Sequence, residues 1–234
     1  MRLRFVNDGW PLEILYALTF SNTGVYTSQG NIINGESEKN WIDDILNDTG
    51  AEKVDLVAHS MGGFSSRYYI KFLGGLSKVD DFVSMGSPQH GVYGGTEVFY
   101  TNNSFLYSLN EGDETPGGIL NDTIGFRIDP LGGRIYNSTH IPGNINYTAI
   151  SSIDDGVALP IITSNLDGAN NIVAEGVEHV EMLYDEGFYN IIKHAVYDGN
   201  SKQNDNLIPG YNLLMLIGFI SLLIIIIIKK QKFK

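Results

Sequence analysis

One serine of the chain lies in a setting that favours a nucleophile. Ser60 is the centre of the run AHSMGG at residues 58–63, which joins an apolar stretch at 54–58 to a helix expected over 62–73. Small residues two places before and two places after a serine let the chain turn sharply between a strand and a helix, which exposes the hydroxyl. A serine that caps a helix gives the same short match. The preceding strand and the second glycine, Gly63, favour the nucleophile.

A serine hydroxyl needs a neighbouring base to remove its proton, and a third group to orient that base. The elbow motif therefore predicts an acid and then a histidine further along the chain. Asp154 and Asp155 follow one expected strand, and His179 follows the last one. His59 lies inside the elbow motif, before the serine. Because no histidines have the spacing of a metal-ligand pair, we expect no metal site. The remaining histidines are His90, His140 and His194.

The elements that must position these side chains alternate between strand and helix. Apolar runs predict strands, and the helical spacing of apolar residues predicts helices. This alternation predicts an α/β fold, a mainly parallel sheet with helices on both faces. The loops that carry Ser60, Gly86 and Asp154 would then meet at the carboxyl ends of the strands, where such sheets bind ligands. The expected strands are 12–20, 54–58, 79–85, 146–151 and 171–174, and the expected helices are 39–47, 62–73 and 185–196.

Composition excludes several classes of function. The chain carries 27 acidic and 15 basic side chains, for a net charge of −12. A nucleic-acid partner is not expected, because neutralising phosphates requires a basic face. The chain has no cysteine, which excludes disulfides, thiolate metal sites and a cysteine nucleophile.

The C-terminal segment predicts a membrane anchor. Residues 207–228 are mostly apolar, include five consecutive isoleucines and are followed by lysines. As a helix the segment would be about 33 Å long, the thickness of a membrane core, although a buried core helix is the alternative. The lysines predict a cytoplasmic tail at 229–234 and a body, residues 1–205, outside the cell. The PGY triplet at 209–211 also resembles the sorting tails of archaeal surface proteins, which a sortase-like enzyme cleaves.

Five potential N-glycosylation sites are compatible with an extracellular surface. They are Asn47, Asn102, Asn121, Asn137 and Asn146.

Four segments, in the same order, resemble the class 2 lipases, a branch of the α/β-hydrolases. They are VDLVAHSMGGFSSRYYIKFLGG (54–75), SFLYSLNEGDETPG (104–117), NYTAISSIDD (146–155) and LDGANNIVAEGVEHVEMLY (166–184). The resemblance implies an α/β-hydrolase fold, an ester or lipid substrate, and no metal or organic cofactor. The run MGSPQHGV at 85–92 is also similar to palmitoyl-protein thioesterases.

The same resemblance implies roles for individual residues. Ser60 is the nucleophile, and His179 is the general base and later the general acid. Asp154 is the expected acid, because the family places this residue three positions before a valine, here Val157. Asp155 is the alternative acid. The backbone N–H of Met61 contributes to the oxyanion hole.

Two differences from the family bear on these implications. The family has a strand and a His-Gly loop before the helix that begins here near Arg2, and the loop supplies a second oxyanion donor. Without that strand we expect a gap between the strand at 14–19 and the strand at 54–58. We hypothesise that the sequence lacks its natural N-terminus, which would also carry the export signal. The insertion at 118–143 is a lid or a surface loop.

We therefore expect a serine carboxylic ester hydrolase that works through an acyl-enzyme at the cell surface. An acyl-thioesterase or an acyltransferase with the same three residues is the alternative within enzymes. An inactive surface-binding homologue is the alternative outside them.

Overall fold

The computed structural model describes residues 1–20, 26–131, 134–197, 211–215 and 222–229. Its centre is a seven-stranded sheet with the order β1-β9-β2-β3-β6-β7, in which β8 also pairs with β9. Strands β2, β3, β6 and β7 run parallel to one another. The parallel strands are β2 (Lys53–Ser60), β3 (Val79–Met85), β6 (Asn146–Ser152) and β7 (Asn170–Ala174), and β1 is Leu15–Leu18. The mainly parallel sheet that the sequence predicts is confirmed.

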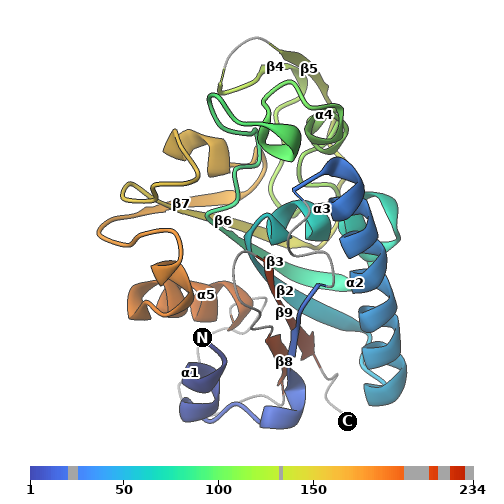
Figure 1. Ribbon diagram of the computed structural model, residues 1–234. Coiled ribbons are helices and arrows are strands. Elements are labelled where there is room, and N and C mark those ends of the chain that lie inside the picture. Colours follow the sequence, from blue (N-terminus) through green and yellow to red (C-terminus); the bar gives the residue numbers. More distant parts are fainter. Residues whose placement is uncertain (21–25, 132–133, 198–210, 216–221, 230–234) are drawn as a thin grey trace.

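Helices cover both faces of this sheet (Figure 1). Alternate residues of β2 explain the two layers, because successive side chains of a strand point to opposite faces. Leu56 packs in one core with α2 and α3, whereas Val57 packs in the other with α1 and α5. Both side chains are fully buried, as expected for a central strand of a parallel sheet. The helices are α1 (Arg2–Asn7), α2 (Ser28–Thr49), α3 (Gly62–Phe72), α4 (Ser104–Asn110) and α5 (Glu186–Tyr197).

Helix α2 is longer than the helix that the sequence predicts at 39–47. The side chain of Thr27 caps its start by accepting a hydrogen bond from the N–H of Gly30, and Gly50 ends it with a φ of 69°. The first half is polar, so it shows little apolar periodicity. One face of this half is nevertheless buried, because it packs closely on α3: a Cβ on Gly35 would lie 3.1 Å from the carbonyl oxygen of Ser65.

The C-terminal segment forms strands where we expected a transmembrane helix. Strand β8 covers Tyr211–Met215 and β9 covers Leu222–Lys229, so the prediction is wrong for these residues, while 207–210 and 216–221 lie outside the described residues. A run of isoleucines suits a central strand as well as a membrane helix, because both must be apolar on every side. Across the described ranges, none of the helices is both long and apolar enough to cross a membrane.

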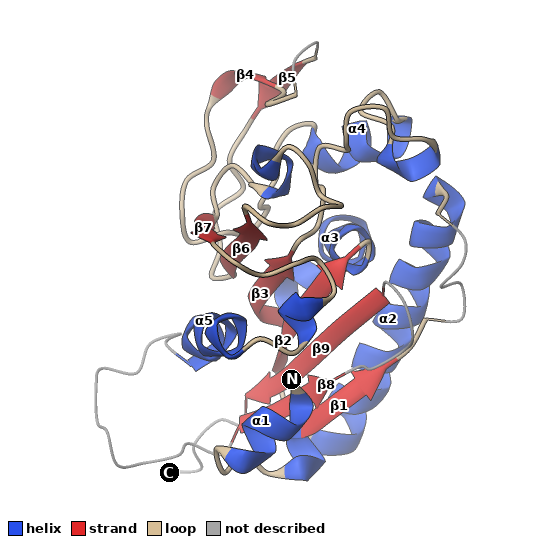
Figure 2. Cartoon of the chain, turned by 60° about the vertical axis from the view of Figure 1, so that its left-hand side comes forward, coloured by secondary structure: helices blue, strands red, loops and turns tan. Residues whose placement is uncertain are grey.

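Strand β9 lies antiparallel between β1 and β2 (Figure 2). Its register pairs Leu222 with Ser60 and Ile227 with Leu15. This is the place where we expected a gap in the sheet. In the structure the position is therefore occupied by a strand from the end of the chain rather than left open.

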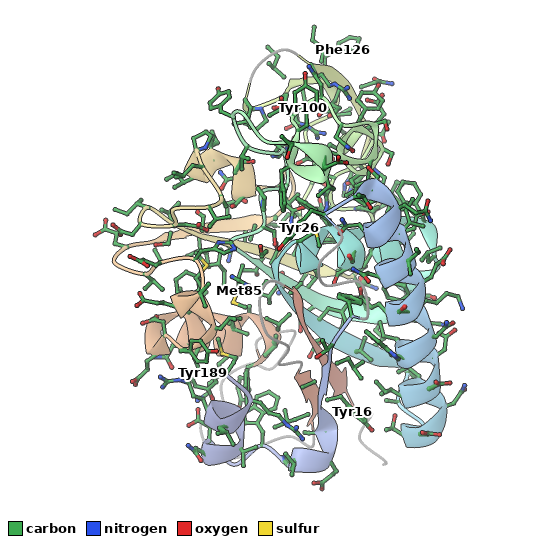
Figure 3. All side chains as sticks on the ribbon, in the orientation of Figure 1. Tyr16, Tyr26, Met85, Tyr100, Phe126 and Tyr189 are labelled. Atoms are coloured by element: carbon green, nitrogen blue, oxygen red, sulfur yellow. The ribbon has the colours of Figure 1, made fainter. Side chains whose placement is uncertain are left out.

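The insertion at 118–143 contains a two-stranded antiparallel hairpin separate from the main sheet. Strand β4 is Gly125–Ile128 and β5 is Ile135–Ser138. Figure 3 shows Phe126 of this hairpin at the end of the molecule opposite α1. Phe126 is largely exposed, whereas Tyr136 of the other strand is buried and donates a hydrogen bond to Asp129.

Candidate active site

Ser60 lies at a strained turn at the end of β2. Its φ is 55°, in the left-handed region that residues other than glycine seldom adopt. Such strain persists only where the surrounding structure imposes it, and it is common at active sites. Met61 caps the start of α3 directly after Ser60. A Cβ on Gly63 would lie 2.3 Å from the Oγ of Ser87, so only glycine allows α3 to begin this close to the loop after β3.

Three of the predicted side chains form one chain of hydrogen bonds. The Nε2 of His179 lies 2.9 Å from the Oγ of Ser60, and its Nδ1 lies 2.9 and 3.0 Å from the two carboxylate oxygens of Asp155. Ser60 ends β2, Asp155 follows β6, and His179 follows β7, so the carboxyl ends of three parallel strands bring them together. All three are buried. This geometry lets His179 take the serine proton at Nε2 while Nδ1–H is held by a carboxylate.

The structure places Asp155 against His179, and Asp154 elsewhere. Asp154 is exposed, and its Oδ2 accepts a hydrogen bond from the backbone N–H of Gly176. The prediction of Asp154 as the acid, made from its position three residues before Val157, is therefore corrected to Asp155. The reason is local: the Oδ1 of Asp155 accepts the backbone N–H groups of Val157 and Ala158, and this turn directs its carboxylate toward the histidine.

Asp155 is held in its ionised form. Its burial raises the pKa, but the hydrogen bond from His179, the charge of that ring and the two backbone N–H donors outweigh burial and leave the pKa below its usual value. An ionised carboxylate at Nδ1 fixes the tautomer in which Nε2 is free to accept the proton of Ser60.

Gly86, the first residue after β3, makes room for this pair. Its φ is 53°, and a Cβ there would lie 2.9 Å from the Sδ of Met182, 3.0 Å from the Oδ2 of Asp155 and 3.2 Å from the Nδ1 of His179. The sequence predicts that the loop at Gly86 lies near the site. It does not show that His179 and Asp155 require a residue without a side chain at this position.

The first half of the chain also matches a known protein family. The family described as "Lipase (class 2)" matches residues 1–117, half of the chain. The chain belongs to the class 2 lipase family. The α/β-hydrolase fold that the resemblance implies is supported by this match together with the mainly parallel sheet.

Solved structures similar to this chain include lipase B of Aspergillus fumigatus. The TM-score is 0.55 at 15% sequence identity, over 79% of this chain and 45% of that one, so the chain spans less than half of that lipase. Two more distant matches are the lin2722 gene product of Listeria innocua (TM-score 0.43, 16% identity, 75% and 68% of the two chains) and a carboxylesterase structure from Nitrososphaera gargenis (0.42, 17%, 76% and 74%).

Of the other histidines of the chain, His59 contacts His179. The remaining three lie outside the group of Ser60, Asp155 and His179. His90 is buried and pairs with Glu114, His140 lies 3.8 Å from Asp113, and His194 belongs to α5. Within the described part of the chain, one group of carboxylates has the spacing of a metal site. It comprises Asp55, Asp80 and Asp81. These lie near the starts of β2 and β3, at the opposite end of the strands from Ser60.

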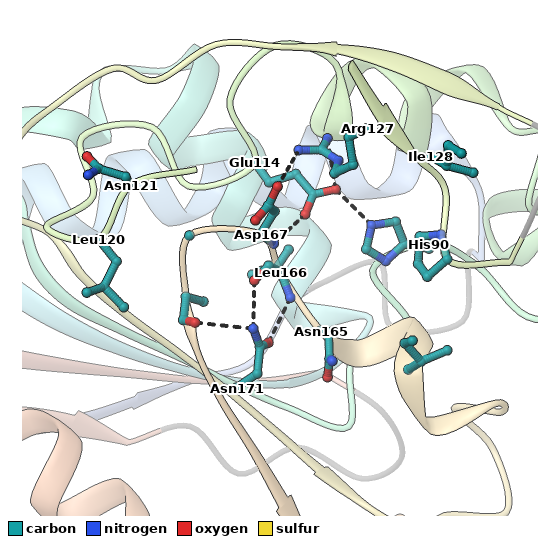
Figure 4. Close-up of a pocket in the computed structure, with 14 residues that line it drawn as sticks. His90, Glu114, Leu120, Asn121, Arg127, Ile128, Asn165, Leu166, Asp167 and Asn171 are labelled. Carbon is teal, nitrogen blue, oxygen red and sulfur yellow. Dashed lines mark hydrogen bonds and ion pairs between the residues drawn. The ribbon is translucent and has the colours of Figure 1, made fainter. Parts of the chain in front are cut away.

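A cavity of about 400 Å³ lies apart from Ser60, Asp155 and His179, none of which lines it (Figure 4). The Oε1 of Glu114 lies 2.7 Å from the Nε2 of His90 and 3.1 Å from an Nη of Arg127. Burial opposes the charge of Glu114, but His90 and Arg127 hold its pKa at about 2. Because Arg127 belongs to β4, this ion pair anchors the inserted hairpin to the body of the molecule.

Proposed function

We propose that this protein is a serine carboxylic ester hydrolase that works through an acyl-enzyme at Ser60. The observation that carries the proposal is His179, whose ring bonds Ser60 at one nitrogen and Asp155 at the other. Membership of the class 2 lipase family supports an ester as the substrate.

The first half of the proposed reaction acylates the serine. The Oγ–H of Ser60 donates to the Nε2 of His179, which takes the proton as the oxygen attacks the ester carbonyl. Asp155 then stabilises the imidazolium through its bond to Nδ1. The backbone N–H of Met61, at the start of α3, is proposed to bind the negative oxygen of the tetrahedral intermediate.

Acylation ends when His179 gives its proton to the leaving alcohol, so the ester C–O bond breaks and the acyl group stays on Ser60. The second half of the reaction releases the acid. Water then enters, and His179 removes one of its protons as the water oxygen attacks the acyl carbon. Collapse of this second intermediate breaks the bond to Ser60, and the serine recovers its proton from His179.

Apolar side chains beside the three residues support a hydrophobic acyl group. Val157 is 52% exposed and follows Asp155 by two positions, and Val180 is 59% exposed and follows His179 directly. Exposed aliphatic side chains that follow Asp155 and His179 so closely in the chain would suit the acyl chain of an ester better than its polar end. We therefore propose lipid-like esters as substrates.

Hydrolysis of p-nitrophenyl esters of graded acyl length tests the activity. We expect turnover by the wild-type chain and its loss in Ser60→Ala, with far-UV circular dichroism showing that both chains are folded. Acyl-thioesters in the same assay separate an esterase from a thioesterase. If the folded wild type hydrolyses no ester and does not react with a fluorophosphonate, the proposed function is wrong and an inactive homologue remains.

We also propose a location outside the cell. Four of the five asparagines in glycosylation motifs are exposed, namely Asn47, Asn102, Asn121 and Asn137. Digestion of intact source cells with an added protease, followed by detection with an antibody to the body of the chain, tests this. Loss of the protein supports the external location, and its survival until the cells are lysed contradicts it.

A further inference from the structure

His59, the residue before Ser60 in β2, contacts the same histidine as the serine does. Its Nε2 lies 2.8 Å from the backbone carbonyl oxygen of His179, and the centres of the two imidazole rings are 4.6 Å apart. The side chain is only 1% exposed. Two consecutive residues of one strand therefore hold His179, one at its carbonyl and one at the Nε2 of its ring.

The protonation of His59 follows from its surroundings. Burial and the neighbouring ring of His179 lower the pKa of His59 to about 3, so it is neutral near pH 7. A carbonyl oxygen can only accept, so the proton of the neutral ring is on Nε2, which donates to His179. The Nδ1 atom is then a bare acceptor, and it has no hydrogen-bond partner among the described residues.

An unpaired buried acceptor lowers stability. An apolar side chain of similar size would avoid that cost, so His59 is a poor choice for packing alone. What distinguishes it from such a side chain is the Nε2–H donor to the backbone of His179.

The backbone at His179 lies between exposed residues. His179 is in the loop between β7 and α5, and its neighbours Glu178 and Val180 are exposed. The bonds from Asp155 and Ser60 hold the ring, but a ring held at both nitrogens still moves with its peptide. The hydrogen bond from His59 ties that peptide to the sheet, through the strand that carries the nucleophile.

We propose that His59 is a positioning residue, which fixes the main chain of His179 so that its Nε2 stays in line with the Oγ of Ser60. This inference rests on the proposed esterase function. A neutral ring at His59 suits this role, because a cation 4.6 Å from the ring of His179 would oppose the imidazolium that forms during the reaction. A displacement of the base by about 1 Å reduces turnover roughly a hundredfold, which bounds the effect of losing the bond.

Three substitutions separate the donor from the bulk of the ring. His59→Gln places an amide N–H near the position of Nε2 and keeps the bond. His59→Asn has the same chemistry but a shorter reach, so its N–H lies near the position of Nδ1 and cannot reach the carbonyl. His59→Leu removes the donor and keeps much of the volume.

We expect kcat to fall about 10- to 100-fold in His59→Leu and His59→Asn, with KM within about twofold of wild type. His59→Gln should keep kcat within about threefold. Rates are measured per active site, by titration with a fluorophosphonate, so that partial unfolding does not mimic the effect. If His59→Leu fails to fold, the comparison between His59→Asn and His59→Gln decides.

A second readout does not depend on turnover. The Nδ1–H proton of His179, bonded to Asp155, gives a low-field NMR resonance that should be retained in His59→Gln and should shift or exchange away in His59→Asn. A wild-type kcat and an unchanged resonance in all three variants would overturn the proposal. A loss of kcat in His59→Gln as large as the loss in His59→Asn would also overturn it. If the wild type hydrolyses no ester, the proposed function fails, while the resonance still tests the positioning.

Discussion

Asp155→Asn and Asp154→Asn form a matched pair that tests which carboxylate orients the base. In the wild type, Oδ1 of Asp155 accepts the N–H groups of Val157 and Ala158 at 2.8 and 3.0 Å, and Oδ2 lies 2.9 Å from the Nδ1 of His179. An asparagine at 155 must keep its only oxygen on the two backbone donors, since an amide NH₂ cannot accept from them. Its NH₂ group therefore faces Nδ1.

This arrangement reverses the tautomer of His179. Nδ1 must accept from the NH₂ group, so the proton moves to Nε2, which can then no longer take the proton of Ser60. In a serine hydrolase of another fold the same change in tautomer lowers kcat about 10⁴-fold. We expect a loss of about 10³- to 10⁴-fold in kcat for Asp155→Asn, with little change in KM.

Asp154→Asn should leave kcat within about twofold of wild type. The side chain is exposed, and an asparagine still offers an oxygen to the N–H of Gly176. Steady-state hydrolysis of one p-nitrophenyl ester measures both variants, with thermal unfolding as the check on folding. A large loss in Asp154→Asn together with near-normal turnover in Asp155→Asn would refute the assignment.

Two further predictions concern stability. Gly86→Ala should lower the free energy of unfolding by about 2 kcal/mol and also lower kcat, because the new Cβ would meet Met182 and Asp155 at a positive φ. Urea unfolding measures the stability and ester hydrolysis measures kcat. An unchanged free energy of unfolding together with an unchanged kcat would contradict the prediction. Burial raises the pKa of Glu38 well above its usual value, which the hydroxyl of Ser66 only partly offsets. At a pH above the pKa of this carboxyl in the unfolded chain, about 4.3, unfolding therefore releases a proton. The free energy of unfolding of the wild type falls as the pH rises through the pKa of Glu38 in the folded chain. Glu38→Gln should remove this slope in urea unfolding between pH 5 and 8; parallel pH profiles would contradict the prediction.

The elbow and the chain order of serine, acid and histidine are the parts of the site that local sequence predicts well. A strand of buried residues, a turn of small residues and a helix are all local features, so Ser60 could be located directly. The choice between Asp154 and Asp155 could not be made this way. It depends on which carboxylate meets the backbone N–H groups of Val157 and Ala158 in the turn after β6, and no local pattern shows that contact.

Two parts of the fold escaped prediction for reasons of environment. The first half of α2 is polar and contains glycines, and its helical form depends on packing against α3, which no local pattern shows. The isoleucine run of β9 is compatible with a membrane helix and with a central strand, and only the position between β1 and β2 distinguishes them. The elbow motif expects its histidine after the serine and so gives His59 no role, although a side chain directly before the nucleophile shares its strand and can reach the base.

The central claim is that Ser60 becomes acylated and that His179, oriented by Asp155, activates it. Mass mapping of peptides after reaction with a fluorophosphonate tests it most directly. We predict an adduct on the peptide that contains Ser60, formed rapidly in the wild type, much more slowly in Asp155→Asn, and not at all in Ser60→Ala. An adduct on a different residue, or ester hydrolysis that continues in Ser60→Ala, would contradict the account.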